Sequence, residues 1–260
     1  MSKKRKLLVT LSAFLLVYAL WGIAGGLLED TRSEVRRGAL PPLAPGGKSV
    51  SAPLSAAPSH HTAEKQEPAI LPEYRELYAQ NPELVGWVSI EGTSIDYPVM
   101  QRGQDEEYYL DHDFEGKKNK NGLPFLDGGC DAQKSNILLV YGHHMKNGRM
   151  FGALMAYKDE SFYDAHPTVR FDTLYEAAEF EIVAVLLSRV YLQSEEAFRY
   201  YRLAGTGTPD GFEQYIQSVK ERALYDTGIS ARYGDQLLVL STCEYSAKNG
   251  RLAVVARKVS

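Results

Sequence analysis

The segment from Leu237 to Val259 constrains the fold most, because it predicts two buried strands joined by a short polar turn. Leu237 to Leu240 is continuously apolar, as in a strand that is covered on both faces. Lys248 to Gly250 has the composition of a turn, and an apolar, partly β-branched run follows from Leu252 to Val255. The sequence therefore predicts a β-hairpin here.

The predicted hairpin carries two residues with useful chemistry. Cys243 ends the first strand and Arg251 begins the second. A thiol that faces a guanidinium suits nucleophilic chemistry, because arginine stays cationic at any working pH and stabilises an oxyanion or holds a substrate carbonyl. The alternative is that Cys243 is a small buried hydrophobic residue, as single cysteines often are. Taken alone, the hairpin favours this structural interpretation.

A second apolar run, Ile137 to Tyr141, predicts a strand that ends at Gly142, His143 and His144. A cysteine needs a base or an imidazolium nearby to become a thiolate near neutral pH. The long stretch of chain between the histidines and Cys243 is no objection, because catalytic partners meet in the fold. Adjacent strand residues face opposite sides, so only one of the two histidines can face the thiol.

Several segments, in this order along the chain, resemble those of class B sortases, the cysteine transpeptidases of Gram-positive bacteria. Leu240-Ser241-Thr242-Cys243 resembles the TLxTC strand of sortases, with Val239 in place of the usual first threonine. Tyr141 to Phe151 is similar to the class B histidine segment, and the order histidine, cysteine, arginine also matches. The resemblance spans about Leu71 to Val259 and includes IDYPVMQ (Ile95 to Gln101), YYLDHDF (Tyr108 to Phe114) and GLPFLD (Gly122 to Asp127).

The resemblance implies a mainly β fold: a closed sortase-type barrel of about eight strands, with an N-terminal helix and an extra helix before the last two strands. The residue pattern by itself predicts an antiparallel barrel or a sandwich, because short apolar runs alternate with turn residues. Helical spacing predicts helices over Leu71 to Gln80 and over Pro209 to Ala223, the second with Asp210 as its cap.

The resemblance also implies a set of site residues. Cys243 is the expected nucleophile, His143 the general acid, and Arg251 the group that steadies the oxyanion or the peptide. His143 is preferred to His144 because the family places its catalytic imidazole directly after the glycine. The candidates for peptide contacts are Ser241 and Thr242.

By the same resemblance, the enzyme cleaves a C-terminal sorting signal after threonine and transfers the acyl group to an amine. Its substrates are expected to be secreted proteins with an NPxTx- or SPxTG-like signal, which are joined to an amine of a peptidoglycan precursor. Three alternatives stay open: a pilin-polymerising sortase, a cell-wall cysteine peptidase, and a catalytically dead, membrane-tethered binding module. A papain-like peptidase would have its cysteine before the histidine and at the start of a helix, unlike this chain.

No metal or organic cofactor is expected. The only other cysteine, Cys130, has no C-x-x-C spacing to suggest zinc. A disulfide between Cys130 and Cys243 is conceivable outside the cell, but it would block the nucleophile, so Cys130 is interpreted as a free, dispensable loop thiol. His112 and His166 are interpreted as structural.

Residues 1–6 form a basic segment, and residues 7–28 carry no charged side chain. About 22 helical residues reach about 33 Å, enough to cross a membrane. Basic residues before this run and Glu29-Asp30 after it favour a cytoplasmic N-terminus and an extracellular catalytic domain, tethered to the cell membrane by a single pass. The alternative is a cleaved signal peptide, which needs a shorter apolar region and a small-x-small site.

Residues 29–69 are rich in proline, alanine, serine and glycine and predict a flexible linker. Within it, His60 and His61 are interpreted as solvated rather than metal-binding. The catalytic domain is predicted over residues 70–260. The formal net charge of −4 gives no sign of a nucleic-acid partner.

Overall fold

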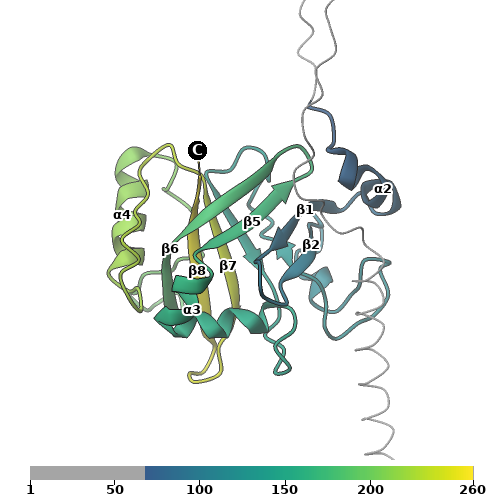
Figure 1. The fold of residues 1–260 in the computed structure, drawn as a ribbon. Helices are drawn as coiled ribbons and strands as arrows, with labels where there is room; N and C mark the ends of the chain where they lie inside the picture. The colour runs from purple at the N-terminus through teal and green to yellow at the C-terminus, as the bar shows by residue number, and fades with distance from the viewer. Residues whose placement is uncertain (1–67, 260) are drawn as a thin grey trace, which may run out of the picture. The chain divides into compact units, whose positions relative to one another are not determined.

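The computed structural model describes residues 68–259, which Figure 1 shows in colour. The predicted cytoplasmic segment 1–6, the membrane anchor 7–28 and nearly all of the linker 29–69 lie outside the described residues. Within residues 68–259, no helix is long and apolar enough to cross a membrane.

Strands form the body of the described chain and close into a barrel in the order β1-β2-β3-β4-β7-β8-β6-β5 (Figure 1). The mainly β, eight-stranded closed barrel is therefore confirmed, and the sandwich is excluded. The expectation of a purely antiparallel sheet is wrong, because β2 pairs with β3, and β4 with β7, in parallel. The strands are β1 (Leu84–Ser89), β2 (Asp96–Met100), β3 (Phe125–Leu126), β4 (Ile137–Tyr141), β5 (Thr168–Thr173), β6 (Ala177–Arg189), β7 (Leu237–Cys243) and β8 (Gly250–Lys258).

The apolar run of β7 reflects its position between two neighbouring strands. It pairs in parallel with β4, from Ile137 opposite Leu237 to Tyr141 opposite Ser241, and antiparallel with β8. The Leu237 to Leu240 side chains are almost completely buried. Because neither face of this part of β7 meets water, apolar and polar residues do not alternate along it.

Two helices were expected, and both are present. The N-terminal helix is α2 (Pro72–Gln80), and α4 (Pro209–Lys220) precedes the last two strands and lies beside β6 (Figure 1). The expected cap of α4 is wrong: Thr208 has the extended backbone of an N-cap, and its hydroxyl accepts a hydrogen bond from Gly211 N at 3.2 Å. Pro209 then occupies the first turn, where its fixed φ suits a helix start. The remaining helical segments are η1 (Tyr108–Leu110), η2 (Phe151–Lys158) and α3 (Glu160–Ala165).

In the class B-like segment Gly122 to Asp127, only the two residues of β3 form a strand. The preceding loop uses its backbone elsewhere: Leu123 N donates to Tyr109 O at 2.8 Å. Gly122 adopts a φ of 57° and lies so close to η1 that a Cβ atom would stand 2.4 Å from Leu110 O. A glycine at this position therefore allows the loop to lie directly against η1.

Candidate active site

Cys243 and Arg251 face each other across the β7–β8 hairpin. They are direct register partners, and both are partly exposed. Side chains of directly opposed strand residues lie on the same face of a sheet, so the thiol and the guanidinium share one face. Arg251 Nη1 also donates to Gly250 O at 2.9 Å. The hairpin therefore brings together the two residues that the sequence places at its strand ends.

The segment after β4 lies beside the end of β7. Gly142 N donates to Ser241 O at 3.1 Å, and Thr242 Oγ1 donates to Gly142 O at 2.8 Å. The last paired residues of β4 and β7 are Tyr141 and Ser241, so continuing the parallel register by two residues puts His143 level with Cys243. The fold thus spans the long sequence interval between the histidine and the thiol.

The His143 ring is held by η1. Its Nε2 lies 2.7 Å from Leu110 O. A carbonyl oxygen only accepts hydrogen bonds, so Nε2 carries a proton and Nδ1 is the ring nitrogen that is left to exchange one. This contact fixes both the tautomer of the neutral ring and its orientation.

The neighbouring His144 ring has a different partner. Its Nδ1 lies 2.9 Å from the main-chain oxygen of Cys243, and the ring stacks on Tyr245 with centroids 4.9 Å apart. The two adjacent imidazoles are therefore directed to different groups: His143 to η1, and His144 to the backbone of the predicted nucleophile.

Ser241 and Thr242 are both buried, with 1% and 2% of their surface exposed. Ser241 Oγ lies 2.7 Å from the hydroxyl of Tyr200, and Thr242 bonds to Gly142 as described above. Both hydroxyls thus have partners inside the protein. The predicted contact of these residues with a peptide stays a prediction, and their burial favours a structural role.

Three further residues near the site have no local sequence signal. Burial raises the pKa of Tyr200 to about 12, although the hydrogen bond with Ser241 and the charge of Arg251 act in the opposite direction. Glu244 directly follows Cys243, and its carboxylate accepts a hydrogen bond from Lys158 at 2.5 Å. The bonds from Lys158 and Ser246 lower the Glu244 pKa to about 2. Only the folded structure identifies Leu110 and Tyr200 as neighbours of the site, and only the folded structure pairs Glu244 with Lys158.

The remaining candidates have structural surroundings. Cys130 and Cys243 are both free thiols, so no disulfide joins them. Cys130 is buried in the core, which raises its pKa, and its Sγ donates to Ile137 O at 3.3 Å. His112 stacks on Tyr108, and His166 packs against Phe162. In the part of the chain that the structure describes, no group of three or more histidine, cysteine or acidic residues is arranged to hold a metal.

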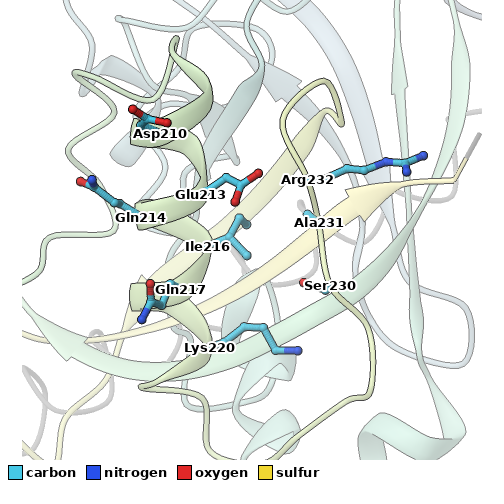
Figure 2. Close-up of a pocket in the computed structure, with 9 residues that line it drawn as sticks. All are labelled: Asp210, Glu213, Gln214, Ile216, Gln217, Lys220, Ser230, Ala231 and Arg232. Carbon is cyan, nitrogen blue, oxygen red and sulfur yellow. The ribbon is translucent and has the colours of Figure 1, made fainter.

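A separate hollow of about 520 Å³ lies between α4 and the loop before β7 (Figure 2). Figure 2 shows Glu213, Ile216 and Lys220 pointing from the helix toward the loop segment Ser230 to Arg232. Cys243 is not among the residues that line this hollow. The hollow therefore does not belong to the thiol site.

Comparison with known proteins identifies the family. The sortase domain model matches residues 88–259, well over half of the chain. Sortase B of Listeria monocytogenes is 34% identical over 191 residues, which cover 72% of this chain and 74% of the relative. Sortase B of Staphylococcus aureus is 29% identical over 196 residues, or 74% of this chain and 77% of the relative.

Comparison with solved structures gives the same family. Sortase B from Bacillus anthracis in complex with AAEK1 superimposes with a TM-score of 0.64 at 30% identity, covering 75% of this chain and 88% of that one. A Staphylococcus aureus sortase B–substrate complex gives a TM-score of 0.65 at 27% identity, with coverages of 74% and 87%. The chain therefore belongs to the sortase family and to its class B branch of cysteine transpeptidases.

Proposed function

We propose that the protein cleaves a C-terminal sorting signal after threonine and transfers the released acyl group to an amine. The observation that carries this proposal is the pairing of Cys243 with Arg251 at the end of β7. The parallel pairing of β4 with β7 supports it, because two further residues in the same register would bring His143 level with Cys243. A nucleophile, a proton donor and a fixed cation in this arrangement suit acyl transfer.

The first half-reaction forms a thioester. The Cys243 thiolate attacks the threonine carbonyl carbon, and Arg251 stabilises the oxygen as it becomes negative. The tetrahedral intermediate then collapses, the peptide C–N bond breaks, and His143 gives its Nδ1 proton to the departing amine. The bond from Nε2 to Leu110 O leaves Nδ1 available for this transfer.

The second half-reaction reverses these roles. An acceptor amine attacks the thioester carbonyl, neutral His143 takes up the amine proton, and Cys243 leaves as a thiolate. The product is a new amide, and the enzyme returns to its starting protonation state. Water in place of the amine would give a carboxylic acid, which is the peptidase outcome.

The proposed substrate is a secreted protein with an NPxTx- or SPxTG-like signal, and the proposed acceptor is the amine of a peptidoglycan precursor. The resemblance to class B segments supports both. The Staphylococcus aureus sortase B–substrate complex lends further support to the binding of a substrate, because it is a solved structure of a class B sortase together with one. The expected result of the reaction is the anchoring of secreted proteins to the cell wall.

The proposed location is the cell membrane, with residues 7–28 as a single-pass anchor, residues 29–69 as tether and the catalytic domain outside the cell. The basic segment before the apolar run and the acidic pair after it support this orientation. Protease treatment of intact protoplasts tests it: the membrane fraction should lose the barrel domain. A domain that stays protected from the protease, or a protein found in the medium without its first residues before any protease is added, would contradict the proposal.

The enzymatic test compares the wild-type protein with Cys243→Ala on a fluorogenic sorting peptide, with and without an added amine. We expect turnover to be lost in Cys243→Ala and kept in the matched variant Cys130→Ala, because Cys130 is buried away from solvent. With amine present, the wild-type product should be the amide. Undiminished turnover by Cys243→Ala would overturn the proposal, and hydrolysis alone in the presence of amine would favour a peptidase.

A further inference from the structure

We infer that His144 and Tyr245 form a clamp that positions Cys243 relative to His143. This inference rests on the proposed roles of Cys243 as nucleophile and His143 as proton donor. In this assignment His144 and Tyr245 are positioning residues, which act on the reaction through the main chain of the two catalytic segments.

The clamp consists of contacts in both directions between the loop after β4 and the loop after β7. His144 Nδ1 lies 2.9 Å from Cys243 O, and because a carbonyl only accepts, Nδ1 is the donor. The Tyr245 hydroxyl donates to His144 O at 3.4 Å, which is a long and weak bond. The two rings stack with an interplanar angle of 22°. The bond from His144 and the ring stack are therefore the main parts of the clamp.

The position of the clamp along the chain explains its effect. His143 lies between Gly142, which is bonded to Ser241 and Thr242, and His144, which is bonded to Cys243. The loop that carries the proton donor is thus attached to β7 on both sides of His143. Without the His144 bond, the loop would remain attached to β7 at Gly142, and the His143 ring would remain held by Leu110 O, but the side of the loop next to Cys243 would lose its bond to β7.

The exposure of Tyr245 also fits a local role. Its side chain is 64% exposed, so burial of apolar surface does not account for its position. Tyr245 contacts His144 through the ring stack and through the bond to His144 O. A displacement of about 1 Å in a catalytic group can cost about 100-fold in rate, so even a modest contact at this position affects turnover.

The competing assignment makes His144 the imidazole that transfers protons. Replacement by asparagine separates the two, because an asparagine amide nitrogen stands about where Nδ1 stands and donates a hydrogen bond, but it exchanges no proton near neutral pH. Positioning by His144 therefore predicts that His144→Asn works and His144→Ala fails. Proton transfer by His144 predicts that both fail.

The experiment measures kcat and KM on the fluorogenic peptide with saturating amine. We expect His144→Ala to lower kcat by about 10- to 100-fold with little change in KM, and His144→Asn to recover most of the loss. Tyr245→Ala should lower kcat by a smaller factor. Tyr233→Ala, which removes another exposed tyrosine whose hydroxyl bonds to Gly207 O, is the matched control, and its kcat should equal that of the wild type.

Wild-type kcat in His144→Ala would overturn the clamp, and equal inactivity of His144→Asn and His144→Ala would assign proton transfer to His144. Circular dichroism and thermal unfolding identify any variant that misfolds. If His144→Ala misfolds, the activity of His144→Asn decides between positioning and proton transfer. Absence of turnover in the wild type would instead contradict the proposed function. In that case the clamp is tested without substrate, by the rate at which a methanethiosulfonate labels Cys243. This rate should differ from the wild-type rate in His144→Ala and should be close to the wild-type rate in His144→Asn.

Discussion

Among single side chains, Arg251 has a role that depends on both its charge and its shape. It lies opposite Cys243 in the β7–β8 register, and its Nη1 already donates to Gly250 O at 2.9 Å. The planar guanidinium carries several further N–H groups, which suit a developing oxyanion or a peptide carbonyl. A lysine would keep the charge but not the arrangement of several donors in one plane.

We predict that Arg251→Ala lowers kcat/KM on the sorting peptide by about 10²- to 10³-fold, as the loss of an oxyanion donor does elsewhere. Arg251→Lys should recover only part of this loss, because its ammonium lacks the planar fork. Arg257→Lys on the same strand is the control, since its guanidinium pairs with Glu181 at 3.0 Å, away from the hairpin turn. Full activity in Arg251→Ala would remove Arg251 from the mechanism.

The local pattern of the sequence predicts part of the site at this scale. Cys243 and Arg251 stand at the ends of apolar runs beside a turn, so their pairing across a hairpin follows from neighbouring residues alone. The contacts of His143 with Leu110 and of Ser241 with Tyr200 join residues far apart in the chain. No spacing or periodicity indicates such contacts, so the sequence alone could not predict them.

At the scale of elements, η2 and the β7–β8 loop are joined by an ion pair next to the site. Lys158 Nζ lies 2.5 Å from a Glu244 carboxylate oxygen, and the Glu244 side chain is 7% exposed. Ser246 N and Oγ donate to the other carboxylate oxygen. The charged carboxylate thus fixes the loop that begins directly after Cys243.

The Glu244 pair predicts a pH dependence. Its pKa is lowered to about 2 in the folded protein, below the ordinary glutamate value of about 4.3. The stabilisation is therefore complete above about pH 5 and is lost as the pH falls toward 2. We expect the difference in unfolding free energy between the wild type and Glu244→Gln, measured with urea, to be largest near neutral pH and to shrink on acidification.

The control for this pair is Glu176→Gln, which removes a far more exposed partner of Lys258. Exposed pairs contribute about 0 to 1 kcal/mol, so this variant should differ little from the wild type at any pH. A Glu244→Gln difference that stays constant from pH 7 to pH 3 would show that the loop does not depend on the carboxylate charge.

A second link between elements joins the segment before α4 to β7. The buried Tyr200 hydroxyl bonds to Ser241 Oγ, and Tyr215 of α4 donates to Tyr200 O at 2.9 Å. Ser241 and Cys243 lie two residues apart on β7, so their side chains share a face. Tyr200 therefore connects α4 to the same face of β7 that carries the thiol.

We predict that Tyr200→Phe lowers the unfolding free energy by about 1 to 3 kcal/mol, because it leaves the buried Ser241 hydroxyl without its partner. Ser241→Ala should lower the unfolding free energy less in the Tyr200→Phe background than in the wild type. The coupling free energy between the two substitutions should be about 0.5 to 3 kcal/mol. Tyr225→Phe, which breaks a bond to Tyr157 O, is the control and should be additive with Ser241→Ala. Strict additivity of Tyr200→Phe and Ser241→Ala would argue against the link.

For the whole molecule, the closed barrel explains why the site has its parts where they are. Parallel pairing of β4 with β7 puts the ends of both strands side by side, and antiparallel pairing with β8 brings Arg251 back to the same level. Apolar runs predicted most strands, and helical spacing predicted α2 and α4. The parallel pairings and the two-residue β3 depend on packing between distant segments, which local patterns do not record. The Thr208 cap is a local contact with Gly211, three residues later, which the threonine before Pro209 already indicates.

The account depends most on Cys243 as the residue that becomes acylated, and intact-mass spectrometry of the protein mixed with a sorting peptide in the absence of amine tests this directly. We expect a species heavier by the acyl portion of the peptide through its threonine, with the added mass mapped to Cys243 and removed by an added amine. Cys243→Ala should show no such species, whereas Cys130→Ala should form it. A protein that cleaves the peptide without acylation, or that carries the acyl group on another residue, would contradict the account.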